Sequence, residues 1–243
     1  VFAVVDCIGL ANADVRNIRA ALADYAKANN IVSINISATH THTGIDTQGI
    51  YTDTFNHVFK NLFAAMAKSD NPCDPVDTKF LANITQKTVA CVKEATESMK
   101  EGELTFAKMD ISDYIRDRTA PYVMIDSLYR LMFKPYDGTK STIIANYGVH
   151  PEAAGYSTKI ITSDFIYYTE KVVNAGGSNF IYIQGAVGTY TESQGASNDG
   201  ISGLNRLTST MRYGEEIGYI LLGMTETEEY CKANIVDPKR EAM

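Results

Sequence analysis

Apolar positions along the chain repeat with two different periods, and the change of period separates strands from helices. Residues 1–5 form an apolar run and residues 31–37 alternate between apolar and polar side chains, so both segments are predicted to be β-strands. Between them, residues 14–28 carry apolar side chains at helical spacing, with Asp14 as a candidate N-cap. This order predicts a parallel βαβ unit at the start of the chain.

The rest of the chain continues the same mixture. The two periods predict helices over 54–68, 77–100, 163–175 and 207–233, and strands over 104–111, 128–134, 141–149 and 179–184. Residues 113–121 follow neither period and are expected to be irregular, and 193–203 reads as a surface loop. The order predicts an α/β fold, a layered domain with a mixed, partly parallel sheet flanked by helices.

The composition is that of an ordinary globular protein, with 45% hydrophobic and 21% charged residues among 243. We expect one domain over 1–243 that is incomplete at both ends, because its first residues already read as a buried strand. The net charge is −7 and the basic residues are scattered, which argues against a nucleic-acid partner. No apolar run approaches the roughly 20 residues that a membrane-spanning helix needs.

Four cysteines lie far apart and form no C-x-x-C pair, so the pattern is not that of a zinc finger. Cys7 and Cys91 are expected to be buried free thiols. Cys73 and Cys231 offer no basis for choosing between a bridge and a free thiol.

Three candidate sites follow directly after predicted strands. His40 and His42 come after the strand at 31–37, His150 ends the strand at 141–149, and the glycine-rich turn 185–188 ends the strand at 179–184. Because ligands of open α/β sheets gather at the carboxyl ends of strands, one common pocket is expected.

The His-x-His spacing suits a metal, because residues i and i+2 of an extended segment project to the same side and can share one cation. The alternative is a pair of solvated histidines hydrogen-bonded to nearby threonines. His150, whose backbone is restricted by Pro151, favours the metal.

Other polar residues are more ambiguous. Arg116 and Arg118 can bind an anionic or carbonyl oxygen, or can pair with neighbouring aspartates at the surface. His57 lies within the helix predicted over 54–68 and is expected to be a structural or surface residue. The chain contains no G-x-S-x-G elbow, Walker loop or G-x-G-x-x-G motif.

Residues 37–44, SATHTHTG, resemble the SATHTHSGP motif of neutral, non-lysosomal ceramidases. Residues 146–150 (NYGVH) are similar to the family segment with the second metal histidine, 162–165 (TSDF) to its S-D-Y segment, and 180–188 (FIYIQGAVG) to its F-x-Q-S-N-A-G-D segment. The four segments occur in the family's order and span most of the chain. Only the His-x-His block is specific by itself.

The resemblance implies a zinc-dependent amide hydrolase in which His40 and His150 bind zinc. His42 would polarise the scissile carbonyl, Arg116 would bind the same oxygen, and Gly185 and Gly188 would contact the substrate. Zinc would activate water to attack a sphingolipid-like or other N-acyl amide. Family members imply a secreted, periplasmic or cell-surface location.

The chain also departs from the family pattern. Gly185 stands where the family has a serine, and Thr189 where it has an aspartate. The family's glutamate and tyrosine ligands are expected from the remainder of the parent chain, so that this chain alone would bind zinc weakly, unless Glu192 or Asp164 replaces the glutamate. These departures keep two alternatives open: a catalytically impaired family member that serves as a binding or structural protein, and an unrelated α/β hydrolase or transferase.

Overall fold

The computed structural model describes residues 1–51, 58–59, 62–63, 66, 76–155, 159–192 and 204–225. Its first part is a parallel pair of strands joined by two helices, β1 (Phe2–Val5), α1 (Asn12–Ala21), α2 (Ala23–Ala28) and β2 (Asn35–Ala38). The predicted parallel βαβ unit is therefore confirmed.

Asp14 acts on the start of α1 from inside the helix. Its carboxylate accepts a hydrogen bond from the backbone N–H of Ala11, the residue that occupies the N-cap, at 3.2 Å. A carboxylate in the first turn can satisfy a free N–H and favour the helix dipole. The prediction that Asp14 is the N-cap is wrong by three positions.

A mixed four-stranded sheet forms the larger part of the fold. Its strand order is β3-β5-β6-β7, with antiparallel pairing of β3 with β5 and of β5 with β6, and parallel pairing of β6 with β7. The strands are β3 (Gly102–Asp110), β5 (Ser127–Pro135), β6 (Ser141–Tyr147) and β7 (Ser178–Gln184). The other elements are α4 (Thr78–Glu97), η1 (Ser112–Tyr114), β4 (Ile115–Asp117), α5 (Phe165–Ala175), β8 (Tyr190–Glu192) and α6 (Leu204–Gly223). The predicted layered α/β fold with a partly parallel sheet and flanking helices is confirmed.

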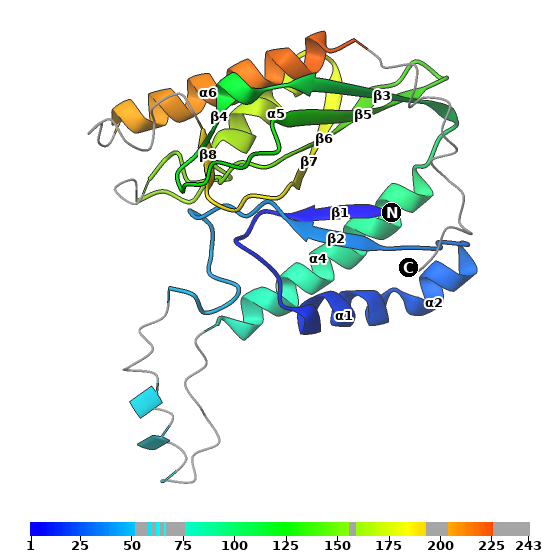
Figure 1. Cartoon of the computed structure of the whole chain (residues 1–243). Coiled ribbons are helices and arrows are strands. Elements are labelled where there is room, and N and C mark those ends of the chain that lie inside the picture. The colour runs from blue at the N-terminus through cyan, green and yellow to red at the C-terminus, as the bar shows by residue number, and fades with distance from the viewer. Residues whose placement is uncertain are drawn as a thin grey trace.

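Helices α5 and α6 pack together and cover one face of this sheet (Figure 1). The strand register places four buried residues in one row across that face: Ala107, Arg130, Ala145 and Tyr182. The guanidinium of Arg130 donates to the carbonyl of Leu221 near the end of α6, at 2.7 Å. A separate core joins α1 and α4 to the β1–β2 pair and contains Ile18, Leu22, Ile34 and Val92.

Strands β1 and β2 contact β7, so the two sheets lie next to each other (Figure 1). The segments that follow β2 and β6 meet beyond the carboxyl ends of these strands, where the His42 N–H donates to the carbonyl of Pro151 at 3.1 Å. The fold thus brings the two histidine-bearing loops together.

Two local predictions differ from the structure. Residues 115–117, expected to be irregular, form β4, which pairs with the unpredicted β8 across more than 70 residues of sequence. Such a short pair has no periodic signal because each strand is stabilised by its distant partner. The helix predicted to reach residue 233 ends at Gly223, with 224 and 225 outside it and the rest beyond the described residues.

Of the two cysteines described, Cys7 is a buried free thiol as predicted, whereas Cys91 is free but exposed. The buried stripe of α4 runs through Thr88 and Val92, and Cys91 lies beside it. Cys73, Cys231, His57 and residues 193–203 lie outside the described residues, as does most of the predicted helix over 54–68.

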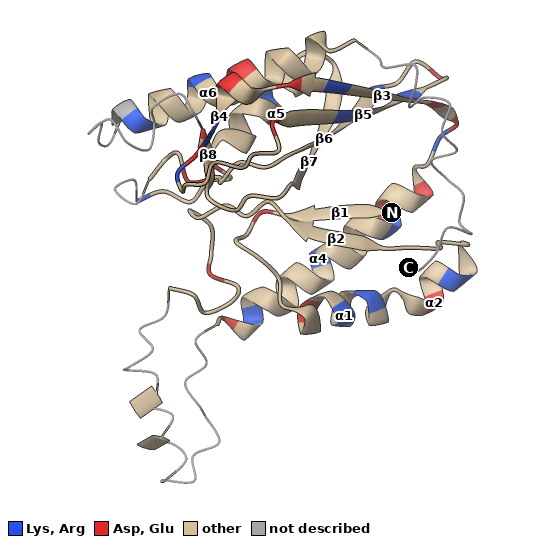
Figure 2. Ribbon diagram, viewed as in Figure 1, with Lys and Arg blue, Asp and Glu red and all other residues tan. Residues whose placement is uncertain are grey.

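Acidic and basic residues are interspersed over the helices and strands (Figure 2). Among the described residues, no helix has the length and apolar character needed to cross a membrane.

Candidate metal site

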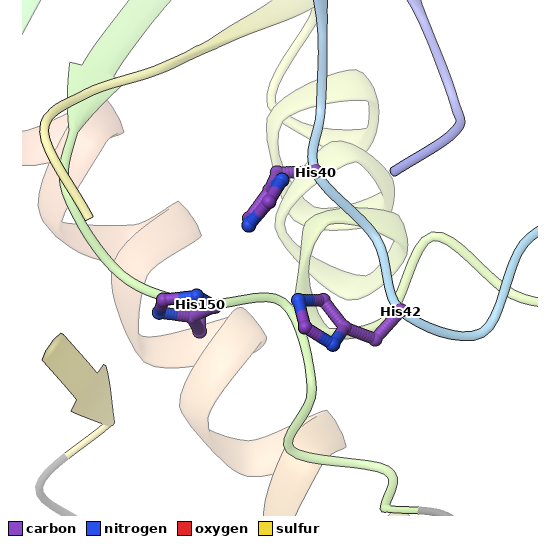
Figure 3. A group of neighbouring side chains, drawn as sticks. All are labelled: His40, His42 and His150. Atoms are coloured by element: carbon purple, nitrogen blue, oxygen red, sulfur yellow. The ribbon is translucent and has the colours of Figure 1, made fainter. Parts of the chain in front are cut away.

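Three histidine side chains face one another beyond the strand ends (Figure 3). The ring centroid of His40 lies 5.0 Å from that of His42 and 5.1 Å from that of His150, and the His42 and His150 centroids are 5.3 Å apart. One ring nitrogen from each residue lies within 4.8 Å of the other two. Imidazole nitrogens grouped in this way are suited to binding a divalent metal.

His40 is held tightly by the segment that follows β1. Its Nδ1 lies 2.7 Å from the carbonyl oxygen of Ile8, and its backbone N–H donates to the carbonyl of Cys7 at 3.0 Å. Because a carbonyl only accepts, Nδ1 carries the proton and the lone pair of Nε2 is free for a metal. His40 also has a φ of +66°, a left-handed conformation that costs a non-glycine residue about 1 kcal/mol.

His150 is held in a similar way by β8. Its Nδ1 lies 3.0 Å from the carbonyl oxygen of Tyr190, and its backbone N–H donates to the same oxygen at 3.1 Å. Its Nε2 is therefore also free to bind a metal. Burial lowers the pKa of His150, although the hydrogen bond to Tyr190 opposes this shift, so the neutral, ligand-competent imidazole is favoured.

His42 differs because both of its ring nitrogens are buried without a hydrogen-bond partner among the described residues. Burial lowers the pKa of His42, and the nearby carboxylate of Glu152 partly opposes this. The His42 Nδ1 is 3.6 Å from that carboxylate, which in turn forms an ion pair with Arg118 at 2.8 Å. A buried imidazole nitrogen normally has a partner, and a metal cation can serve as that partner for His42.

Glu152 is the carboxylate of this site that sequence reasoning missed. It is mostly buried, with 12% of its side chain exposed, and its N–H donates to the carbonyl of His150 at 2.9 Å. Its position two residues after His150 is the sequence signal that could have identified it, although it does not lie in a segment that matches the family's motif.

A short segment before α5 links the two histidine loops. The hydroxyls of Thr41 and Thr43 both donate to the carbonyl of Thr162 at 2.8 Å. These bonds fix the conformation of the loop on either side of His42.

Asp164 completes this link as the N-cap of α5. Its carboxylate accepts from the N–H of Phe165 and from that of Ala154, each at 2.8 Å, so it also holds the loop after His150. Burial raises the pKa of Asp164 to about 6.

The carboxylates named as possible replacement ligands lie elsewhere. Within the described residues, the group able to share a metal contains His40, His42 and His150 and includes neither Asp164 nor Glu192. Glu192 is fully buried on β8, opposite Ile115 of β4.

Gly185 and Gly188 form the turn between β7 and β8. A Cβ atom at Gly185 would lie 2.7 Å from the carbonyl carbon of Tyr147 and 2.9 Å from the nitrogen of Gly148. Gly188 has a φ of +45°. This turn leads directly to Tyr190, the residue that anchors His150.

Arg116 lies on β4, in register with Thr191 of β8. The guanidinium of the next arginine, Arg118, reaches the histidine cluster through Glu152. Its N–H donates to the carbonyl of Thr189 at 3.2 Å, which attaches it to the same turn.

Comparison with protein-family models and with curated proteins finds no match. Among solved structures, the neutral ceramidase from Pseudomonas aeruginosa is similar, with a TM-score of 0.70 and 14% identity over 94% of this chain and 36% of that one. A ceramidase described as complexed with C2 is similar with a TM-score of 0.67, at 14% identity and the same coverage. The chain therefore has a ceramidase-like fold and spans about a third of the length of these structures.

Proposed function

We propose that this chain is the metal-binding part of a zinc-dependent amide hydrolase related to the neutral ceramidases. The observation that carries the proposal is the cluster of His40, His42 and His150 at the carboxyl ends of strands, on a ceramidase-like fold. Its substrate is an N-acyl amide, either sphingolipid-like or of another kind.

The residues present fit zinc. His40 and His150 each use Nδ1 to donate to a backbone carbonyl, which leaves Nε2 as the ligand atom, a common arrangement for zinc-binding histidines. When bound, zinc supplies a Lewis acid for the amide carbonyl and makes a water acidic enough to act near neutral pH. The resemblance assigns Arg116 to the carbonyl oxygen and places His42 beside the metal, where it would polarise the carbonyl, although the position of His42 also fits a ligand.

The remainder of the parent chain is proposed to contribute the glutamate and tyrosine of the family site. This proposal is supported by coverage, because the chain spans 36% of the neutral ceramidase that it resembles. A secreted, periplasmic or cell-surface location is proposed from the same resemblance.

The resemblance supports amide hydrolysis as the reaction more strongly than it supports ceramide as the substrate. Gly185 and Gly188 are proposed to contact the substrate, but Gly185 lacks the hydroxyl of the family serine. The backbone of Tyr147 and Gly148 occupies the space that a side chain at position 185 would need. Attack by activated water needs no serine, so this departure bears on specificity more than on reaction class.

The absence of the family serine at position 185 supports a second candidate function. A family member that has lost the serine and the space for it can persist as a binding or structural protein. This candidate predicts metal binding without hydrolysis, whereas the first predicts both.

The test uses the protein with any sequence that adjoins these 243 residues, in wild-type form and as His40→Ala, His150→Ala and His57→Ala. Bound zinc is measured by elemental analysis, and fatty-acid release is measured with a panel of N-acyl amides. His57 is the matched control because it is the fourth histidine of the chain and the sequence predicts a structural or surface role for it.

We expect one zinc per chain and amide hydrolysis in the wild type and in His57→Ala, with both lost in the other two variants. Zinc that remains bound in both cluster variants would refute the metal site. Zinc that depends on the cluster, but without hydrolysis of any amide, would favour the second candidate.

A further inference from the structure

We infer that His42 is a third metal ligand, through Nε2, and that Glu152 and Arg118 are positioning residues that orient it. The inference rests on the metal site proposed above. It departs from the resemblance, which places His42 at the substrate carbonyl.

The distances between the rings do not distinguish His42 from the two predicted ligands. Its ring centroid lies 5.0 and 5.3 Å from those of His40 and His150, whose own separation is 5.1 Å. Figure 3 shows the ring nitrogen of His42 that is farther from its backbone, Nε2, on the side facing the other two rings. The opposite nitrogen, Nδ1, is the one that faces Glu152.

The three histidines share one pattern of surroundings. Nδ1 of His40 and of His150 faces a backbone carbonyl oxygen, and Nδ1 of His42 faces a carboxylate. A carboxylate or carbonyl behind a metal-binding histidine fixes its tautomer and makes the coordinating nitrogen more basic. At 3.6 Å the His42–Glu152 contact is an electrostatic one, longer than a hydrogen bond.

Glu152 is itself held in position from two sides. Arg118 pairs with it at 2.8 Å, and its own N–H is bonded to the carbonyl of His150. The His42 N–H donates to the carbonyl of Pro151, so the loops of His42 and His150 are joined next to this carboxylate. The chain therefore orients all three imidazoles before any metal binds.

This arrangement changes the expected behaviour of the chain toward zinc. Three histidines with one open position are a sufficient set for a catalytic zinc, whereas two hold the ion poorly. The chain should therefore bind zinc without ligands from other residues, contrary to the weak binding expected from two histidines.

The test is a double-mutant cycle on zinc affinity, which is measured by competition with a chromophoric chelator. The proteins are the wild type, His42→Ala, Glu152→Gln and the double variant, with Glu94→Gln as the control for loss of one exposed carboxylate on α4. His42→Gln serves as a second His42 variant. Thermal melts in EDTA establish that each variant folds, and the visible spectrum of bound Co²⁺ reports on the coordination shell.

We expect Glu152→Gln to weaken zinc binding by about 10–100-fold, which is typical for loss of a group behind a metal-binding histidine. His42→Ala should weaken zinc binding more and should alter the Co²⁺ spectrum. Adding Glu152→Gln to His42→Ala should cause no further loss, because the carboxylate acts through the ring that is already absent. Glu94→Gln should bind zinc as the wild type does.

Unchanged zinc affinity in both folded His42 variants would overturn the inference. It would also be overturned if Glu152→Gln weakened zinc binding equally in the wild type and in His42→Ala. If zinc then still depends on His40 and His150, the metal site of the proposed function stands. If zinc depends on all three histidines but no amide is hydrolysed, the inference stands and the proposed activity fails. A wild-type chain that binds no zinc contradicts the inference, whereas the proposed function fails only if the protein with its adjoining sequence also binds none.

Discussion

Replacing Gly185 with serine restores the residue of the ceramidase motif, and we expect it to destabilise the protein without creating ceramidase activity. The end of β7 lies against the end of β6 at this point, and the Gly185 N–H donates to the carbonyl of Tyr147 at 2.9 Å. On the other side of the contact, a Cβ at Gly148 would lie 2.0 Å from the carbonyl oxygen of Ala186. The two loops therefore approach each other more closely than side chains allow.

The size of the effect follows from these contacts. The new Cβ would lie 2.7 Å from the carbonyl carbon of Tyr147, whereas ordinary contacts begin at 3.4 Å. The atoms that it meets belong to the backbone, so relief requires the two strand ends to separate. Overpacking of this kind costs about 1–3 kcal/mol, and loss of the Gly185–Tyr147 hydrogen bond adds about 1 kcal/mol.

The assay is thermal unfolding followed by circular dichroism, with Gly223→Ser as the matched control. No heavy atom lies within 4 Å of a Cβ built at Gly223. For a protein of this size, a loss of about 2–4 kcal/mol lowers the Tm by roughly 4–16 °C. The control should stay within about 0.5 kcal/mol of the wild type. Equal melting of the two serine variants would contradict the close approach of the loops.

Three further predictions follow from the site. In EDTA, His40→Gly should be about 1 kcal/mol more stable than His40→Ala in denaturant unfolding, because glycine tolerates a φ of +66°; equal stabilities would argue against the left-handed conformation. Burial raises the pKa of Asp164 from 3.8 to about 6, so the folded state binds the proton more tightly than the unfolded state. Its contribution to the free energy of unfolding should fall by about 3 kcal/mol as the pH rises from about 4 to 6. The free energy of unfolding of the wild type should therefore fall by this amount relative to that of Asp164→Asn over the same pH range. Parallel pH profiles of the two proteins would rule out the raised pKa. Finally, zinc at 100 times its Kd should stabilise the wild type by about 2.7 kcal/mol but leave the Tm of His150→Ala unchanged, and a similar rise in both would place the ion elsewhere.

Much of the fold could be predicted because its signals are local. The apolar run at 1–5, the alternation at 31–37 and the helical spacing between them indicate a βαβ unit without knowledge of any distant contact. The boundaries were less predictable, as Asp14 shows, because a first-turn carboxylate and an N-cap both precede the same apolar pattern. The β4–β8 pair could not be predicted, since each of its strands exists through a partner far away in the sequence.

For the site, the amino-acid sequence alone showed which imidazoles were available and that each follows a strand. The spacing of His40 and His42 and the position of His150 after a strand are properties of the chain alone. That the three rings come together could be seen only in the folded chain, because their separation depends on how the β1–β2 pair lies against β7. The folded structure was also needed to show that Glu152 faces His42 and that Gly185 has no room for a serine. These are contacts between segments more than 30 residues apart, and no local period encodes them.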